Sequence, residues 1–554
     1  MNEPRNGNNR RSSRASGVIA KADGRSPEQQ PGTSQRSDGV GVDGMSGRGS
    51  RISRETCGCE SEDTTSHSSC VKCDKVGQAT AGVGVLHSSD DLWEMITHGE
   101  PREDTYPDAM KRSGDYGDGS QELPTPDQVR KLQITLYRKA KAEPEYRFWS
   151  LYGELLRKDV LETAWKRVAQ NGGAAGVDGQ TIKQIAATSK GQKQWLEGLR
   201  EELKMKTYRV SPVRRVLIPK PDGGERPLGI PTVKDRVVQM AVYLVLMPIF
   251  EADFHSQSYG FRPKRNAHQA IEAIRKALQQ GRSEVIDADL SKYFDTIPHL
   301  ELMREVARRI SDGSILRFIK SWLRASIVEE DEQGNKQMRV NRSGTPQGGV
   351  ISPLLANVYL HSLDKEVNEQ WTSSPRMVRY ADDIVILCWP RKSGRVKARL
   401  DQWLASKGLK LNEKKTRLID HRQQGFNFLG FSFRWAQSQG GKSYSHVEPS
   451  QASRHRLRER LRGILHRGTH WRQTQEVIAE VNQVVRGWSQ YFRYANSTDV
   501  FTHVQRSMRR RVRTWLWLKH GRRRWIDREA LHERYGLYRM PLTAQWKHPN
   551  LKAE

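Results

Sequence analysis

The chain has 554 residues and a formal charge of +29, from 93 Lys and Arg against 64 Asp and Glu. A positive charge of this size predicts a polyanionic partner, either nucleic acid or an acidic membrane surface. We expect neither a membrane-spanning nor a secreted protein, because the longest apolar run, residues 237–250, is too short to cross a bilayer and the first residues lack an apolar signal core. Five cysteines are too few for a disulfide framework, which favours a reducing compartment.

The N-terminal segment has little to bury. Its first leucine is Leu86 and its first aromatic residue is Trp93, and Gly, Ser, Arg and Asp dominate before them. Such a composition cannot offset the entropy that is lost on ordering, so we expect residues 1–125 to be mostly disordered.

The same segment holds four cysteines whose thiolates could bind Zn²⁺: Cys57, Cys59, Cys70 and Cys73. The second pair has the spacing of a zinc knuckle, but the first pair is closer than usual. Few apolar residues lie nearby to build a small core around a metal. A disordered tail is therefore the preferred interpretation, and a zinc site is the alternative.

Folded sequence is expected from about residue 126, where helical apolar spacing begins and continues to residue 170. From Val210 onward, short β-rich runs alternate with helical ones, and this mixed order predicts an α+β core. The β-rich runs lie at 213–218, 285–290, 377–380, 384–387 and 426–433. After residue 452 the pattern is helical only, with Arg and Trp interleaved, and residues 451–554 carry about half of the total charge, a net +15.

Two adjacent acids, Asp382 and Asp383, stand at the expected turn between the β-rich runs 377–380 and 384–387. Hairpin turns usually prefer Asn-Gly or Asp-Gly, and two like charges beside a buried strand are costly without a cation. A solvated acidic turn is the alternative interpretation, since acids are common in turns.

A second acidic cluster favours a metal site. The β-rich run 285–290 carries Asp287 and Asp289, which strand alternation puts on one face. Two strands that each offer carboxylates at one sheet edge can hold two Mg²⁺ ions. Ions about 4 Å apart would activate an attacking 3′-hydroxyl and stabilise a leaving pyrophosphate, which is the two-metal arrangement of polymerases.

The two acidic motifs resemble those of reverse transcriptases. The run Tyr-Ala-Asp-Asp that ends at Asp383 resembles the signature hairpin of that family, and the run Asp-Leu-Ser-Lys-Tyr-Phe-Asp that begins at Asp289 resembles its first catalytic motif. The resemblance implies that Asp289 and Asp382 are the principal metal ligands and that Asp383 is the third acid. Asp287 and Asp295 would have supporting roles.

A longer match narrows the family. Residues 343–357, around Pro346-Gln347-Gly348-Gly349, resemble group II intron reverse transcriptases, and residues 217–231 resemble their first fingers motif. By this resemblance a lysine and an arginine grip the triphosphate, and a tyrosine is the steric gate that crowds the sugar 2′ position and selects deoxynucleotides. The residues implied at the nucleotide are Lys220, Arg226, Tyr293, Gln347 and Lys414. Solvated surface charge is the alternative for the lysine and the arginine of the fingers.

Two further segments match with less specific roles. Residues 258–268 resemble the second fingers motif, for which we expect template or structural contacts. Residues 426–431 resemble the primer grip, in which a glycine lets the backbone approach the primer, although the aromatic residues there could simply form core.

The basic C-terminal region resembles the thumb and maturase domain of group II intron proteins around residues 485–492. Arginines for phosphates and aromatic rings for stacking suit single-stranded or structured RNA. The candidate RNA-binding residues are Arg486, Arg509, Arg510, Arg511 and Arg513. A solvated helix face is the alternative interpretation. No cysteine follows Cys388, so the paired cysteines of an HNH endonuclease are missing and endonuclease activity is not expected.

These patterns together predict a right-hand polymerase of the α+β class, with an antiparallel sheet in fingers and palm over residues 126–440, a helical thumb/maturase domain over 452–530 and a short tail over 531–554. The resemblance implies an RNA-directed DNA polymerase that also binds group II intron RNA for splicing and mobility. Its partners would be intron RNA, an RNA template, a DNA primer or target, and deoxynucleotides. The alternatives are a domesticated enzyme of DNA repair or defence and a splicing factor without polymerase activity. We expect a cytoplasmic, nucleoid-associated protein, with an organelle as the alternative.

Overall fold

The computed structural model describes residues 125–541, except 220–224, 331–334, 347 and 522–525. The expected disordered segment and its four cysteines, the proposed zinc ligands, therefore lie outside the described residues, apart from Thr125. Among the helices of the described part, none has the length and the apolar character needed to cross a membrane.

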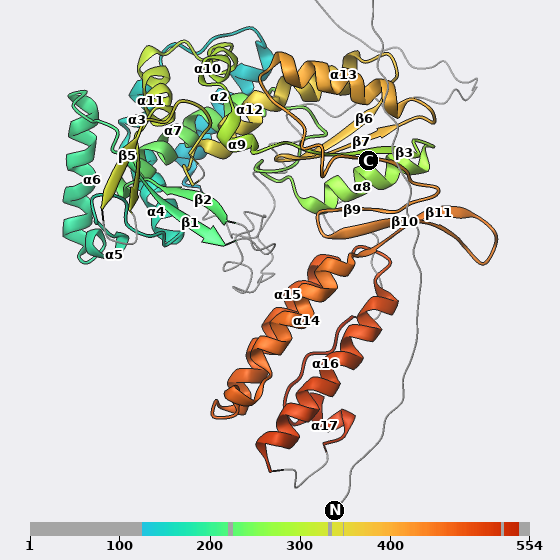
Figure 1. The fold of residues 1–554 in the computed structure, drawn as a ribbon. Helices are drawn as coiled ribbons and strands as arrows, with labels where there is room; N and C mark the ends of the chain where they lie inside the picture. Colours follow the sequence, from blue (N-terminus) through green and yellow to red (C-terminus); the bar gives the residue numbers. More distant parts are fainter. Residues whose placement is uncertain (1–124, 220–224, 331–334, 347, 522–525, 542–554) are drawn as a thin grey trace, which may run out of the picture. The chain divides into compact units, whose positions relative to one another are not determined.

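The fingers begin with helices and continue into a mixed sheet (Figure 1). Strands β1 and β2 form an antiparallel hairpin, β4 pairs parallel to β1, and β5 pairs antiparallel to β4. The elements are α2 (Asp127–Ala142), α3 (Tyr152–Leu155), α4 (Lys158–Gln170), α5 (Ile182–Ile185), α6 (Ser189–Lys204), β1 (Val213–Pro219), β2 (Glu225–Ile230), β4 (Ile327–Glu330) and β5 (Lys336–Arg339).

Helix α7 (Val233–Glu251) is the central helix of this region, and it is buried on nearly every side. It contains the apolar run 237–250, so its interpretation as a buried helix is confirmed, since a helix that is apolar all round belongs in a core. Its contacts with α2 include the Gln133 side-chain amide, which donates to the carbonyl of Leu244 at 2.9 Å.

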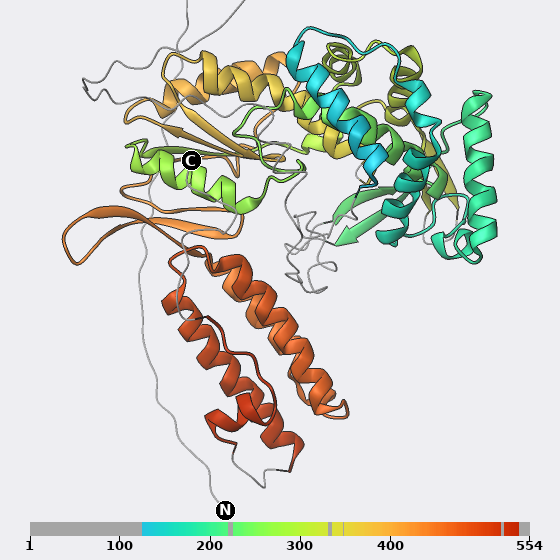
Figure 2. The same cartoon turned by 180° about the vertical axis from the view of Figure 1, so that it is seen from behind.

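The palm is a four-stranded antiparallel sheet in the order β6-β7-β3-β8, which confirms the expected antiparallel sheet of an α+β fold. Apolar residues of the strands face two cores: Ile286 and Ile386 pack with α12 and α13, whereas Val285 and Val385 pack with α8 and the thumb. Figures 1 and 2 show α13 and α8 on opposite sides of this sheet. The elements are α8 (Ala267–Gln279), β3 (Glu284–Asp289), α9 (Tyr293–Thr296), α10 (His299–Ala307), α11 (Gly313–Leu323), α12 (Ser352–Lys365), β6 (Arg376–Tyr380), β7 (Asp383–Cys388), α13 (Ser393–Ser406) and β8 (Arg417–Asp420).

A three-stranded sheet, β9 (Phe426–Phe428), β10 (Phe431–Gln437) and β11 (Ser443–Pro449), leads from the palm to the thumb. The single β-rich run expected over 426–433 is thus two strands, because Leu429 and Gly430 both have positive φ and turn the chain. The thumb helices are α14 (Gln451–Ile464), α15 (Thr474–Phe492), α16 (Thr498–Lys519) and α17 (Arg528–Glu533).

The expected domain boundaries need two corrections. Residue 440 falls inside the β10–β11 hairpin, so the palm side ends later than predicted. The tail expected from residue 531 is wrong up to Met540, because Leu531, Leu537 and Met540 are buried in the thumb core. Burial of these apolar side chains gives the segment a packing role that its polar composition concealed.

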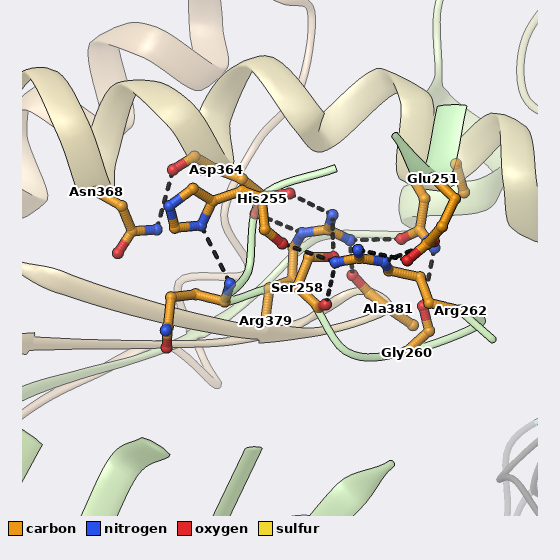
Figure 3. A network of polar contacts seen from close by, with 12 residues as sticks. Glu251, His255, Ser258, Gly260, Arg262, Asp364, Asn368, Arg379 and Ala381 are labelled. Carbon is orange, nitrogen blue, oxygen red and sulfur yellow. Dashed lines mark hydrogen bonds and ion pairs between the residues drawn. The ribbon is translucent and has the colours of Figure 1, made fainter. Parts of the chain in front are cut away.

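A buried arginine supports the turn between β6 and β7 (Figure 3). Arg379 has no exposed surface, and its Nε and Nη2 donate to the two carboxylate oxygens of Asp364, at 2.8 and 2.5 Å. Its Nη1 donates to the Asn357 side-chain oxygen and to the carbonyl of Ala381, and its Nη2 also donates to the Ser258 hydroxyl. All five guanidinium N–H groups therefore have acceptors, as a buried charge requires.

The loop that precedes α8 packs against the same turn. A Cβ at Gly260 would lie 2.3 Å from the backbone nitrogen of Ala381, so only glycine allows this approach. The carbonyl of Gly260 accepts from the Asn357 amide at 2.8 Å. Arg262 holds the loop from within by donating to both carboxylate oxygens of Glu251 and to the carbonyls of His255 and Ser258.

The turn itself is strained, because Ala381 has a φ of 58°, a left-handed conformation that costs a non-glycine residue about 1–2 kcal/mol. The carbonyl of Ala381 is fixed by Arg379 at 2.8 Å. The hydrogen bonds of Arg379 thus stabilise the strained left-handed backbone of Ala381.

Replacing Arg379 with alanine should lower the free energy of unfolding by about 3–5 kcal/mol, because the Asp364 carboxylate would remain buried without its partner. The shift of the urea midpoint measures the loss. Arg304→Ala, which removes an exposed arginine paired with Glu301, is the control and should change stability by no more than about 1 kcal/mol. Equal shifts for the two variants would contradict the supporting role of Arg379.

Candidate active site

Strand pairing brings the two acidic motifs together at one end of the palm sheet. Asp289, the last residue of β3, is the register partner of Asp383, the first residue of β7. Asp382 lies in the turn just before Asp383, between β6 and β7. Acids far apart in the sequence thus meet because β3 and β7 are antiparallel neighbours.

Burial, and then the charge of neighbouring carboxylates, raises the pKa of two of the acids, Asp382 and Asp383. Burial raises the pKa of Asp382, and the charge of Asp289 adds to the rise. Asp383 keeps exposed surface as a residue, yet its carboxyl group is crowded by protein atoms. That crowding raises the pKa of Asp383 to about 7, and the charges of Asp382, Asp289 and Asp287 contribute. A cation among these groups would relieve the repulsion.

Two basic side chains from the segment after α13 approach the acids. Arg417 donates from Nη2 to Asp287 at 2.7 Å, and the Lys415 ammonium lies 3.6 Å from an Asp289 carboxylate oxygen. Burial raises the pKa of Asp287, whereas the bond from Arg417 lowers it. Asp287 is thereby engaged by an arginine. The proposed supporting residue Asp295 lies in α9, where its carbonyl accepts from the Ser343 hydroxyl.

Over the described residues, no group of three or more His, Cys, Asp or Glu side chains is arranged so as to hold a metal ion unaided. The donor chemistry nevertheless fits Mg²⁺, which is commonly bound through one or two carboxylates together with substrate phosphates rather than in an all-protein cage. The carboxylates of Asp289, Asp382 and Asp383 are the candidates for that role.

Tyr293, the expected steric gate, is buried. Its ring is only 2% exposed, and its hydroxyl donates to the carbonyl of Ala356 at 2.6 Å, so it is held inside the palm. The neighbouring Phe294 is half-buried and lies at a ring distance of 5.5 Å from Tyr293. The motif does not say which of these two adjacent rings faces the core, and the structure buries Tyr293 more deeply than Phe294.

The glycine-rich loop before α12 meets both the fingers and α7. Gly348 has a φ of 109°, and a Cβ there would lie 2.3 Å from the carbonyl of Gly229 in β2. The Gln239 side-chain oxygen accepts from the backbone N–H of Val350 at 2.8 Å. The loop is thus fixed between the fingers hairpin and the central helix. Gln347, the expected nucleotide contact, lies outside the described residues.

The remaining expected nucleotide contacts are only partly described. Lys220 lies outside the described residues, and Arg226 lies in β2 as the register partner of Ile218 in β1. Lys414 is exposed, and it is the adjacent Lys415 that approaches Asp289. Lys415 was not foreseen, although its place one residue after Lys414 in a lysine pair made it an equal candidate.

The motifs with weaker expected roles form core. Phe426, Phe431 and Phe433 are almost fully buried, so the core interpretation of these aromatic residues is supported. Ser258 and Arg262 belong to the network behind the turn. Two contacts join these motifs to the thumb. The hydroxyl of Tyr491 donates to the Leu429 carbonyl, and the ring of His268 donates to the Tyr491 carbonyl.

The thumb arginines differ in exposure. Arg486 and Arg510 are exposed, and the Arg486 guanidinium lies 5.2 Å from the Tyr538 ring centre. Arg509, Arg511 and Arg513 are half-buried on α16. Burial lowers the pKa of Arg509, and the positive charge of Arg528 lowers it further. Positive charges of α16 and α17 thus gather around Arg509.

Two models of known protein families match parts of the chain. A family model described as reverse transcriptase (RNA-dependent DNA polymerase) matches residues 218–433. A second, described as the maturase-specific domain of group II introns, matches residues 454–531. The first covers the palm with the fingers hairpin, and the second covers the thumb helices.

Three curated relatives are similar to the chain. Protein YkfC of Escherichia coli is 34% identical over 343 residues, which is 54% of this chain and 87% of YkfC. Group II intron-encoded protein LtrA of Lactococcus lactis is 37% identical over 40% of this chain and 35% of its own length. The putative COX1/OXI3 intron 1 protein of Saccharomyces cerevisiae is 28% identical over 50% of this chain and 38% of its own length. The chain thus spans most of YkfC but only about a third of the two intron proteins.

The palm acids, the helical thumb and the order of the two matched domains agree with one another. The reverse transcriptase match contains both acidic motifs, and the maturase match contains the arginines of α15 and α16. The chain belongs to the family of group II intron-encoded reverse transcriptases and maturases.

Proposed function

We propose that this reverse transcriptase adds deoxynucleotides to the 3′-hydroxyl of a primer at the acids Asp289, Asp382 and Asp383. The observation that carries the proposal is the register of β3 and β7, which makes Asp289 and Asp383 direct neighbours. Burial raises the pKa of Asp382 and of Asp383, and the charge of Asp289 adds to both rises; a solvated turn poorly explains such carboxylates, because its acids would be free to separate.

The three carboxylates would hold Mg²⁺, which when bound activates the attacking hydroxyl and stabilises the leaving pyrophosphate. The chain's own residues position the site. The Arg379 network fixes the turn that carries Asp382 and Asp383, and the loop at Gly348 brings the fingers hairpin close to the palm. The Lys415 ammonium lies 3.6 Å from an Asp289 carboxylate oxygen, and its positive charge would attract the phosphates of an incoming nucleotide.

For sugar selection we propose Phe294 in place of Tyr293. Phe294 retains exposed surface next to the first acidic motif, whereas the ring of Tyr293 is engaged inside the palm. A ring at this position would crowd a 2′-hydroxyl and leave a deoxyribose unhindered.

We also propose that the positive thumb binds the phosphates of folded intron RNA, which serves splicing, and that reverse transcription of that RNA serves intron mobility. The crowded arginines of α16 support this role, because a polyanion would relieve their repulsion. The intact acid set argues against a protein confined to splicing, since a pure RNA-binding protein does not need three adjacent carboxylates.

Replacing both Asp382 and Asp383 with alanine should abolish primer extension on a poly-rA template with Mg²⁺ and dTTP, because the metal-binding oxygens are lost. Binding of RNA should stay within about tenfold, since the thumb is untouched. Asp401→Ala, which removes an exposed acid of α13 paired with Lys397, is the control and should extend normally. Extension at the wild-type rate by the double variant would refute the metal assignment.

Replacing Phe294 with valine should relax sugar selection by at least about tenfold, measured as incorporation of a ribonucleotide relative to the matching deoxynucleotide. The control is Tyr293→Phe, which removes only the hydroxyl that donates to Ala356 and should leave selection unchanged. Relaxed selection in the control, with unchanged selection in Phe294→Val, would restore Tyr293 as the gate.

A further inference from the structure

One tryptophan of the thumb stands out by its exposure. Trp471 is 84% exposed in the loop between α14 and α15, whereas Trp165, Trp322, Trp371 and Trp515 are each at most 3% exposed. Tryptophan is usually well buried, and a single large ring in water forgoes the free energy that burial would supply. Single exposed rings are common on protein surfaces, so the case for a partner depends on how this ring is held and on the charges near it.

The loop that carries Trp471 is well anchored, so its exposure is not the result of loose packing. The Thr469 side-chain oxygen lies 2.9 Å from the carbonyl of Ile464, and it accepts from the indole N–H of Trp515 at 3.0 Å. The Lys519 ammonium donates to the carbonyls of His470 and Arg472, both at 2.6 Å. Helix α16 therefore fixes the residues on both sides of Trp471 and holds its ring out into solvent.

Positive charge surrounds the ring. Arg467 is exposed in the same loop, and Lys519 is anchored beneath it. Burial lowers the pKa of His470, and the charges of Lys519 and Arg467 lower it further, which reflects the positive potential of the loop. Arg472 is paired with Glu480 at 2.8 Å, so it adds less to this potential. The combination of a flat ring and nearby cations suits a nucleobase flanked by phosphates.

The loop is remote from the proposed polymerase site. The Ser453 hydroxyl, near the start of α14, donates to the carbonyl of Gly430 beside the palm, and Trp471 follows the far end of that helix. A helix of this length spans about 20 Å, and Figures 1 and 2 show the loop at the end of α14 away from the β9–β11 sheet.

We propose that Trp471 is a stacking platform for an unpaired nucleobase of folded intron RNA, with Arg467 and Lys519 neutralising the adjacent phosphates. The inference rests on the proposed RNA binding by the thumb. It adds a site that recognises a single unpaired base at the end of the thumb, where charge alone would accept any duplex.

The test compares the full-length protein and its variants by fluorescence anisotropy, with an RNA hairpin that has an unpaired loop and a blunt RNA duplex with the same number of phosphates. Trp471→Ala should weaken hairpin binding by about tenfold or more, since stacking on one base is worth this much. Trp471→Phe should retain binding within about threefold, and duplex binding should not change. The control is Trp149→Ala, which removes another exposed tryptophan, 70% exposed in the fingers, and should bind both RNAs normally.

Two further measurements are needed. The first distinguishes binding by stacking from binding by charge, and the second distinguishes binding of intron RNA from binding of the template strand. The dependence of the Kd on salt should be the same for Trp471→Ala and wild type, whereas alanine at Arg509, Arg510 and Arg511 should flatten it, because only charged residues release counterions. Primer extension on poly-rA should be unchanged in Trp471→Ala.

Hairpin binding within twofold of wild type in Trp471→Ala, or an equal loss on the duplex, would overturn the proposal. A matching loss of primer extension would assign the base to the template strand and would likewise overturn it. If wild-type protein fails to bind either RNA, the proposed RNA-binding function fails and not only the role of Trp471.

Discussion

The position of the proposed catalytic acids depends on one buried ion pair. Arg379 and Asp364 meet through two hydrogen bonds in the interior, and the remaining N–H groups of the arginine hold the turn, α12 and the loop before α8. A buried pair of this kind contributes little net stability compared with an apolar substitute, but it specifies one arrangement of the segments that it joins. Here those segments are the turn that carries Asp382 and the helix that follows the glycine-rich loop.

Acidic and basic residues have different places and different roles in this chain. The chain has a formal charge of +29, yet the proposed reaction centre is a set of acids, and burial together with neighbouring carboxylates raises the pKa of Asp382 and Asp383 within it. Arginines in the palm interior form buried ion pairs that stabilise the fold, as Arg379 does with Asp364 and Arg262 with Glu251. By contrast, Arg510 on α16 and Arg467 in the loop of Trp471 are exposed and can meet a polyanion. Position within the fold therefore decides whether a basic residue stabilises the protein or serves its partner.

Much of the palm could be predicted from the sequence because its strands are short apolar runs. The runs expected at 285–290 and 384–387 correspond to β3 and β7 within a residue at each end, and their acids meet as strand pairing requires. Strands β2, β4, β5, β8 and β11 were not among the expected β-rich runs, since polar residues interrupt their apolar pattern. The burial of Tyr293 could not be predicted, because Tyr293 and Phe294 are adjacent rings and only packing decides which of them faces the core.

Arg379 was also missed, although it left a signal: a lone arginine in the apolar run Met377-Val378-Arg379 is costly to bury without an acid. Which acid it would meet depends on how α12 packs on the sheet, and sequence spacing does not reveal that.

Whether the pair of Arg379 and Asp364 positions the acids for reaction is tested most directly by the rate constant for a single dTTP addition by Asp364→Asn, measured below the variant's unfolding transition. We expect a rate constant about a hundredfold lower with primer–template affinity unchanged, as for a displaced reacting group. A wild-type rate constant in the folded variant would show that the acids keep their positions without this pair.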